Sequence, residues 1–382
     1  MNKQKICIIG DGLAGLSTAI ILSNENIQID LYSGSSKKNK LKIDTRTTAI
    51  SESSYQFIKQ KFNIKSQNIF WACKEINLFF EDNKKIKHFL NFKEKNKNLM
   101  YVFKNKELKK KINIQILKKK NIKVIEKDIT NINCKEGLIS LNKKKFVYDL
   151  IILSIGGNSK LYNKIDYGRA IKKNYKEIAI TTTIKHNSKI NNASQFFLKE
   201  GPLAILPFGK DAFSLVWSVS NSFFYKNNSS LKKKIEMKLK TLLNNTIIKN
   251  ISEIQSFPIS LNLKTRYSNK NTIILGDGLH TVHPMAGQGF NLVLRDIKKL
   301  SELIAKTLKL GLLLKNSLLF KDFYQSRKPE NIILGLGINL TNTFFKDNKY
   351  FFPIKKIILN NVKKFNFIKK MSQKISDKGI VI

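Results

Sequence analysis

Arginine is scarce in this chain of 382 residues. Only five of the 70 Lys and Arg residues are arginine, and the lysines are scattered along the whole length, although the formal net charge is +43. Base-edge and bidentate phosphate recognition favour arginine, and no basic helix with interleaved aromatic residues is visible. We therefore expect no nucleic-acid partner and assign the lysines to solvated faces, which leaves attraction to anionic membranes open.

Cysteine and long apolar runs are also scarce. Cys7, Cys73 and Cys134 are odd in number, widely spaced and form no CxxC pair, which excludes a disulfide framework and predicts reduced, buried thiols. No run of 18 apolar residues occurs, and the apolar part of the N-terminus is too short for a signal peptide. The sequence predicts a globular protein that is neither secreted nor membrane-spanning.

Histidine occurs only four times. His280 and His283 stand three residues apart, which raises a metal hypothesis, but no cysteine or suitably spaced carboxylate accompanies them. The chain also has no H-E-x-x-H motif and no serine nucleophile elbow. We therefore expect no metal site and expect the chemistry to belong to a bound cofactor.

The N-terminal segment carries a dinucleotide-binding pattern. An apolar strand at residues 6–9 precedes GDGLAG at 10–15, and an apolar helix over 13–22 leads to a second strand at 27–32. In this G-x-G-x-x-G, the first glycine makes the tight turn, the second admits a pyrophosphate and the third lets the helix pack on the strand. The predicted cofactor-binding residues here are Gly10, Gly12, Leu13, Ala14 and Gly15.

The pattern is imperfect at its end. An acidic residue usually closes the second strand and holds the ribose hydroxyls, but Ser33 stands there, and Asp30 lies on the opposite face of a strand with period two. Serine still hydrogen-bonds a ribose, though less strongly than a carboxylate. Ser33 is therefore the predicted ribose contact.

Glycines also gather in GDGLHTVHPMAGQGFNLVLRD, residues 276–296, where an apolar strand ends and a helix over 287–307 is predicted. Unpaired N–H groups at a helix start favour negative charge, and Gly287 and Gly289 allow a flat ligand to approach. Asp277 is placed to accept from ribityl hydroxyls, and Pro284 would form a rigid wall. The segment predicts a flavin site.

The rest of the chain contains both helical and strand-like segments. Residues 44–51 are expected to enter a helix that ends near Phe62, whereas 69–92 and most of 170–260 are strand-like. We therefore predict an α/β protein with a Rossmann-like cofactor domain, an inserted β-rich substrate domain and a C-terminal helical segment. The predicted boundaries are 1–70, 100–165 and 270–330 for the cofactor domain, 71–99 and 166–269 for the substrate domain, and 331–382 for the helical region.

Three motifs together resemble a known family. Residues 10–15, the D-T-R at 44–46 and residues 276–296 look like the class A flavoprotein monooxygenases, which are similar to p-hydroxybenzoate hydroxylase, and more narrowly like the ubiquinone-biosynthesis hydroxylases. EGPLAILPF at 200–208 and FYQSRKPEN at 323–331 extend the resemblance. It spans about residues 5 to 345.

The resemblance implies a glutathione-reductase-type FAD domain and hydroxylation of the ring of a polyprenylated phenol by dioxygen. Pro284 and His283 are the predicted catalytic residues, with Pro284 beside the reactive face of the flavin. The remaining predicted FAD contacts are Arg46, Asp277, Gly287, Gln288, Gly289, Phe290 and Asn291. A lipid substrate further implies a cytoplasmic enzyme peripheral to the inner membrane, with other ubiquinone-biosynthesis enzymes as possible partners.

One departure bears on the electron donor. The family has an Asp-Gly pair after the third cofactor-domain strand, whereas Ile155 precedes Gly156 here. The external donor is therefore NAD(P)H or a ferredoxin-type protein. A catalytically silent flavoprotein partner and another flavin oxidoreductase, such as a prenyl reductase, stay open as alternatives. The Lys-rich apolar stretch 351–376 either lies in a membrane interface or packs on the cofactor domain.

Overall fold

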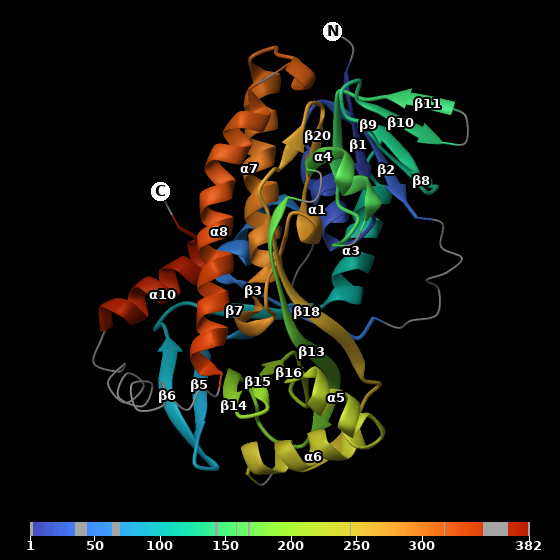
Figure 1. Cartoon of the computed structure of the whole chain (residues 1–382). Coiled ribbons are helices and arrows are strands. Elements are labelled where there is room, and N and C mark those ends of the chain that lie inside the picture. Colours follow the sequence, from blue (N-terminus) through green and yellow to red (C-terminus); the bar gives the residue numbers. More distant parts are fainter. Residues whose placement is uncertain are drawn as a thin grey trace.

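The computed structural model has a parallel sheet at one end and a larger mixed sheet at the other, with long helices along one side (Figure 1). The structure describes residues 3–34, 44–62, 69–141, 144–157, 159–166, 169–244, 246–316, 318–346 and 366–380.

The parallel sheet is built on the N-terminal strand. β1 pairs in parallel with both β12 and β2, and the sheet order is β19-β20-β12-β1-β2-β8. β1, β2, β12 and β20 are short, largely buried runs, as the sequence predicts for a parallel sheet. The edge strands β8 and β19 are more exposed, and β19 pairs antiparallel with β20. The strands are β1 (Gln4–Ile9), β2 (Ile27–Ser33), β8 (Ile122–Glu126), β12 (Leu150–Leu153), β19 (Ser268–Asn269) and β20 (Thr272–Ile274).

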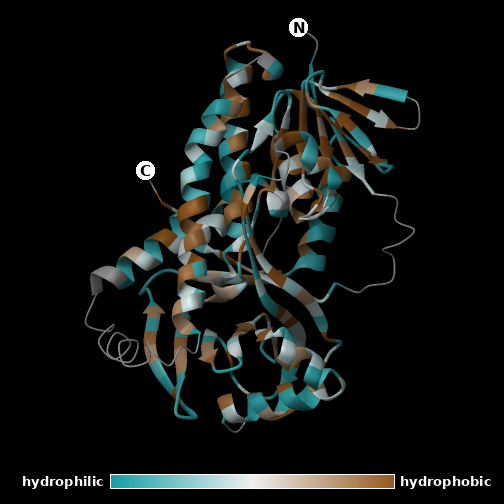
Figure 2. Cartoon of the chain, viewed as in Figure 1, coloured by the Kyte–Doolittle hydropathy of each residue, from teal (hydrophilic) through white to brown (hydrophobic). Residues whose placement is uncertain are grey.

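Helices α1 (Leu13–Leu22), α3 (Asn105–Leu117) and α7 (Gly289–Lys309) contribute to the core around this sheet. α3 buries the stripe of Leu108, Ile112 and Ile116 that the sequence predicts. α7 packs on α8 (Leu319–Phe345), and the two run side by side (Figure 1). Figure 2 shows apolar and polar residues alternating along α8, as expected for a helix with one covered face.

The larger sheet has the order β21-β18-β13-β16-β15-β14-β5-β6, with β17 also paired to β13. Its strands are β5 (Glu75–Asp82), β6 (Lys85–Lys93), β13 (Ala170–His186), β14 (Ala193–Leu198), β15 (Gly201–Pro207), β16 (Ala212–Ser220), β17 (Ile248–Ile251), β18 (Gln255–Lys264) and β21 (His280–Thr281). The helices α5 (Asn221–Asn227) and α6 (Leu231–Leu242) follow β16 in the chain, and α6 buries Leu231, Ile235 and Leu239.

A third sheet of the fold is small. It consists of β3 (Thr47–Ser51), β7 (Met100–Lys104) and β4 (Trp71–Cys73), and β3 leads into α2 (Glu52–Lys61). The expectation that residues 44–51 simply enter a helix was wrong for 47–51, because these residues pair along their whole length with β7. Tertiary pairing decided the conformation, as it often does for short β-branched runs.

The remaining described elements are short or terminal. They are β9 (Asn131–Asn133), β10 (Leu138–Leu141), β11 (Lys144–Val147), α4 (Asn163–Asp166), α10 (Asn366–Lys378) and the 3-10 turns Lys160–Tyr162, Asn228–Ser230, Gly276–Gly278, Met285–Gly287 and Leu314–Asn316. The predicted domain boundaries stay a prediction. β5 and β6 extend the sheet of β13 to β18, whereas β4 belongs to the small sheet.

Within the described part of the chain, no helix is long and apolar enough to cross a membrane. Cys7, Cys73 and Cys134 are free and buried. Residues 35–43 and the first part of the 351–376 stretch lie outside the described residues.

Candidate functional site

The turn between β1 and α1 forms a cradle at the start of the helix. Gly10 has φ +113° and donates its N–H to the carbonyl of Tyr32 (2.9 Å). A Cβ on Gly15 would collide with the Gly10 carbonyl, so helix and turn pack without side chains between them. A Cβ on Gly12 would meet nothing within 4 Å, and α1 has neither a side-chain cap nor an acidic residue in its first turn. This open space and the unpaired N–H groups fit a pyrophosphate.

A cavity of about 340 Å³ continues from this turn and is lined by Gly10, Tyr32, Gly34, Asp128 and Ile155, among others. It lies where the nucleotide half of a dinucleotide is expected. Ser33, the predicted ribose contact, is 9% exposed and is flanked by two lining residues.

Asp30 is not among the residues that line this cavity. Its carboxylate accepts a hydrogen bond from the Tyr148 hydroxyl (2.7 Å) and pairs with Lys5 (3.0 Å). The Tyr148 hydroxyl also lies 2.8 Å from that of Tyr32. Asp30 therefore cannot replace the missing acid at the end of β2.

The two glycine-rich turns touch each other. A Cβ on Gly276, which has φ +75°, would lie 2.9 Å from Cβ of Ala14. Arg46 binds Asp44 through two nitrogens, at 2.8 and 2.9 Å. The hydrogen bond to Asp44, aided by the charge of Asp277, raises the pKa of Arg46. The predicted FAD contacts Arg46 and Asp277 thus lie within electrostatic range of one another.

The turn before α7 is braced by Asn291. Its Oδ1 accepts from the backbone N–H of Ser51 (2.9 Å), and its Nδ2 donates to the Gly287 carbonyl (3.2 Å). Gly287 has φ +62°, and a Cβ there would lie 3.1 Å from Cβ of Ala49 on β3. Glycine is therefore needed both for the backbone conformation and for the close approach of β3.

The other predicted flavin contacts around this turn differ in their surroundings. A Cβ on Gly289 would meet nothing within 4 Å, so the first residue of α7 leaves open space. Gln288 lines the main cavity, and its buried Oε1 has no hydrogen-bond partner among the described residues. Phe290, by contrast, packs on the core, with its ring 6.3 Å from that of Phe103. Only the backbone of Phe290 fits the role of a flavin contact.

The main cavity has a volume of about 610 Å³ and lies between the turn before α7, strands of the larger sheet and α10. Pro284 and Gln288 line it, whereas His283 is not among its lining residues. Its apolar lining includes Ile76, Leu78, Phe92, Phe197, Leu206, Val216, Met285 and Ile338. Polar side chains also line it, among them Gln195, Gln288 and several residues of α10. A cavity with apolar walls and polar groups that can orient a ligand is typical of a small-molecule site.

The two histidines of the turn bind carboxylates instead of facing the cavity. Nε2 of His283 lies 3.0 Å from Glu177, and Nε2 of His280 lies 2.6 Å from Asp296. Both side chains are buried, and no group of three potential metal ligands occurs among the described residues. The catalytic role predicted for His283 stays a prediction, and the geometry makes it a support of the turn that carries Pro284.

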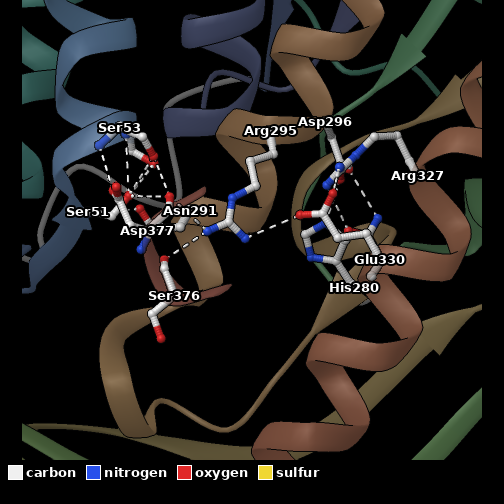
Figure 3. Close-up of polar contacts among 12 residues, drawn as sticks. Ser51, Ser53, His280, Asn291, Arg295, Asp296, Arg327, Glu330, Ser376 and Asp377 are labelled. Carbon is white, nitrogen blue, oxygen red and sulfur yellow. Dashed lines mark hydrogen bonds and ion pairs between the residues drawn. The ribbon is translucent and has the colours of Figure 1, made fainter. Parts of the chain in front are cut away.

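Sequence reasoning missed the carboxylates that hold these histidines. Figure 3 shows Asp296 between His280 and Arg327, whose Nε lies 2.7 Å from Asp296, and shows Glu330 between Arg327 and Arg295. The scarcity of arginine was a usable signal, because Arg295 and Arg327 are both part of this network. Nothing in the sequence marked Glu177 or Glu330.

The sequence is similar to those of known proteins. The profile of the FAD binding domain family matches residues 169–312. The chain is 25% identical to the ubiquinone biosynthesis monooxygenase COQ6, mitochondrial, of Dictyostelium discoideum, over 92% of this chain and 86% of that protein. It is also 25% identical to the 3-demethoxyubiquinol 3-hydroxylase of Escherichia coli, over about half of each chain.

Solved structures show the same fold. The p-nitrophenol 4-monooxygenase PnpA of Pseudomonas putida superimposes with a TM-score of 0.78, at 12% identity and 99% coverage of both chains. PqsL of Pseudomonas aeruginosa, in complex with 2-aminobenzoylacetate, gives a TM-score of 0.75 at 15% identity, over 91% of this chain and 97% of its own.

Proposed function

We infer that the chain belongs to the FAD-dependent monooxygenases, in the group of the ubiquinone-biosynthesis hydroxylases, and that it hydroxylates the aromatic ring of a polyprenylated phenol in that pathway. The observation that carries the proposal is the position of the apolar cavity. Its wall is the turn of Pro284 and Gln288, directly before the helix whose start fits the ring of a flavin. An aromatic ring in this cavity lies against the cofactor.

The glycine turns supply the FAD site. Gly12 leaves room for the pyrophosphate, Asp277 is placed for the ribityl hydroxyls, and Gly287 keeps the start of α7 free of a side chain. The unpaired N–H groups there favour negative charge on the flavin ring. When bound, FAD supplies the redox chemistry that activates dioxygen.

The protein's own part is placement and exclusion of water. Pro284 gives a rigid cavity wall because its ring fixes φ. His283 holds Met285, the residue after Pro284, by accepting its N–H at Nδ1 (3.2 Å). The apolar lining keeps water from the reacting atoms, which strengthens electrostatic interactions in the site. No side chain of the described cavity is required to act as a nucleophile.

The electron donor is proposed to be external, either NAD(P)H or a ferredoxin-type protein. Ile155 lines the nucleotide cavity where the resemblance implies an acid, and Ser33 closes β2 without a carboxylate. Both replacements remove a negative charge that accepts from sugar hydroxyls. They favour the ferredoxin-type donor over direct binding of a nicotinamide.

A membrane surface is the proposed source of the substrate. α8 exposes Ile333, Leu340 and Phe344, and the neighbouring α10 exposes Met371 among several lysines. Apolar side chains flanked by lysines are typical of an interfacial surface. Co-flotation with vesicles containing anionic lipid, lost on Leu340→Glu but not on Leu117→Glu at a distant exposed site, supports this part. Equal flotation of both variants contradicts it.

The absorption spectrum of the purified protein, followed by anaerobic reduction, tests the function. We expect a flavin spectrum, bleached by a reduced ferredoxin or by NAD(P)H, and one hydroxylated product per dioxygen consumed with a prenylated phenol. A spectrum without flavin contradicts the proposal. Bound flavin that no donor reduces, with or without substrate, assigns the chain to a silent partner in the pathway, and reduction without hydroxylation assigns it to another oxidoreductase.

A further inference from the structure

The last turn of α10 is held by an arginine from α7. Nη2 of Arg295 donates to the carbonyl of Ser376 (2.9 Å) and lies 3.3 Å from that of Asp377. The final carbonyls of a helix have no partner within the helix and carry the negative end of its dipole. A guanidinium at this point therefore supplies both hydrogen bonds and favourable charge.

The same turn also caps the start of α2. Oδ1 of Asp377 accepts the backbone N–H of Ser53 (2.8 Å), and the Asp377 carbonyl accepts from the hydroxyls of Ser53 and Ser51 (3.0 Å for Ser51). A carboxylate at a helix N-terminus is stabilised by the unpaired N–H groups there. Figure 3 shows Ser51, Ser53 and Asp377 gathered at one point, beside the guanidinium of Arg295.

Arg295 is itself fixed from the other side. Its Nη1 lies 3.4 Å from Glu330, which also binds Arg327, and Arg327 in turn binds Asp296. The Arg295 side chain is only 11% exposed. The Arg295 guanidinium that holds α10 is therefore fixed by contacts between two packed helices, α7 and α8.

The helix held in this way forms part of the main cavity. Lys370, Gln373, Lys374 and Asp377 of α10 line the 610 Å³ space, together with strands of the larger sheet. Ser51 links α10 to the start of α7, because its hydroxyl binds Asp377 and its N–H binds Asn291. A displacement of α10 would both open the cavity and remove a support of the turn where FAD is expected.

We propose that α10 is the wall that sets the size of the ring-binding cavity and keeps water out of it, and that Arg295 is the positioning residue that holds this wall. The inference rests on the proposed function for the identity of the bound ring. With α10 in place, the cavity ends at its polar side chains. With α10 displaced, solvent reaches the cavity and the size limit is lost.

Limited trypsin digestion of the FAD-loaded full chain tests the wall without any substrate. In Arg295→Gln we expect cleavage after Lys370 and Lys374 to be roughly tenfold faster than in the wild type, because loss of a charge-assisted contact raises the open fraction. Iodide should quench flavin fluorescence more strongly in this variant. The cleavage rate and the quenching of Arg295→Lys should lie between those of Arg295→Gln and the wild type, since lysine keeps the charge but lacks the planar guanidinium. Arg266→Gln, at an exposed arginine, should match the wild type.

Equal cleavage after Lys370 and Lys374 in Arg295→Gln and the wild type would overturn the inference. Faster cleavage spread evenly over the chain would do so as well, because it would make Arg295 a general support of the fold. With a phenolic substrate, we expect Arg295→Gln to raise KM and lower product per dioxygen. If no phenol is hydroxylated, the proposed function fails, while digestion and quenching still decide the role of α10.

Discussion

Nε2 of His283, in the turn before α7, lies 3.0 Å from Oε2 of Glu177 on β13. The Met285 N–H points at Nδ1 of the same ring (3.2 Å), so the ring proton of the neutral imidazole is on Nε2 and is donated to Glu177. A register shift in β13 immediately precedes Glu177. The contact fastens the cavity turn to the larger sheet.

Breaking the contact between His283 and Glu177 should lower the stability of the fold, and the two residues should show a coupling energy. His283→Asn leaves a buried carboxylate with one partner fewer, so we expect the free energy of unfolding to fall by about 2–4 kcal/mol. A double-mutant cycle with Glu177→Gln, measured by urea unfolding, should give a coupling of about 1–3 kcal/mol. His88→Asn, at an exposed histidine, is the control. A coupling near zero would show that the contact does not support the turn.

Gly12→Val should abolish FAD binding without unfolding the protein. The space beside Gly12 is open in the protein, so the new side chain is accommodated by the fold but occupies the place of the pyrophosphate. Gly337→Val on α8 is the matched control, because a Cβ there also meets nothing within 4 Å. We expect the first variant to be colourless and the second yellow, with both showing wild-type circular dichroism. Wild-type flavin content in Gly12→Val would contradict the placement of the site.

Gly15 is unsuitable for the same test. Any side chain there meets the Gly10 carbonyl, so Gly15→Ala should lower stability as well as flavin content. Thermal unfolding of apoprotein separates the two glycines: we expect a clearly lower Tm for Gly15→Ala than for Gly12→Val. The opposite order would mean that the turn packs differently from the structure.

Asp296 should make the stability of the protein sensitive to acid. Burial raises its pKa, but Arg327 and His280 outweigh burial and hold the pKa below the usual carboxyl range. The unfolded chain therefore takes up the proton at higher pH than the folded chain. The contribution of Asp296 is complete above the ordinary aspartate pKa of about 3.9 and is lost as pH falls through the lower folded-state pKa.

The variant Asp296→Asn tests this dependence. At neutral pH we expect the free energy of unfolding to fall by about 3–5 kcal/mol, because Arg327 loses a buried partner. Between about pH 5 and pH 2, its unfolding free energy should change less with pH than that of the wild type. Asp211→Asn, at an exposed aspartate, should keep the wild-type slope. An unchanged slope in Asp296→Asn would remove Asp296 from the acid response.

Much of the cofactor end of the protein was readable from the sequence. The glycines at 10, 12 and 15 follow a short apolar strand and precede an apolar helix, and these local signals agree with one another. The same holds for α3, whose buried stripe recurs at helical spacing. The strand β3 was missed because its pairing with β7 joins residues about fifty positions apart, and no local signal announces such a pairing.

The sequence by itself determined the dinucleotide turn and the helix after the second glycine-rich turn, because glycine spacing and apolar periodicity act over a few neighbouring residues. Its resemblance to a known family indicated the class of chemistry. Only the tertiary structure decided that His283 turns to Glu177, that Arg295 holds α10 and that α10 lines the cavity. The first two contacts join residues 106 and 81 positions apart. Their formation depends on how the sheets and helices pack, since a buried charge is stable only where the fold brings it a partner.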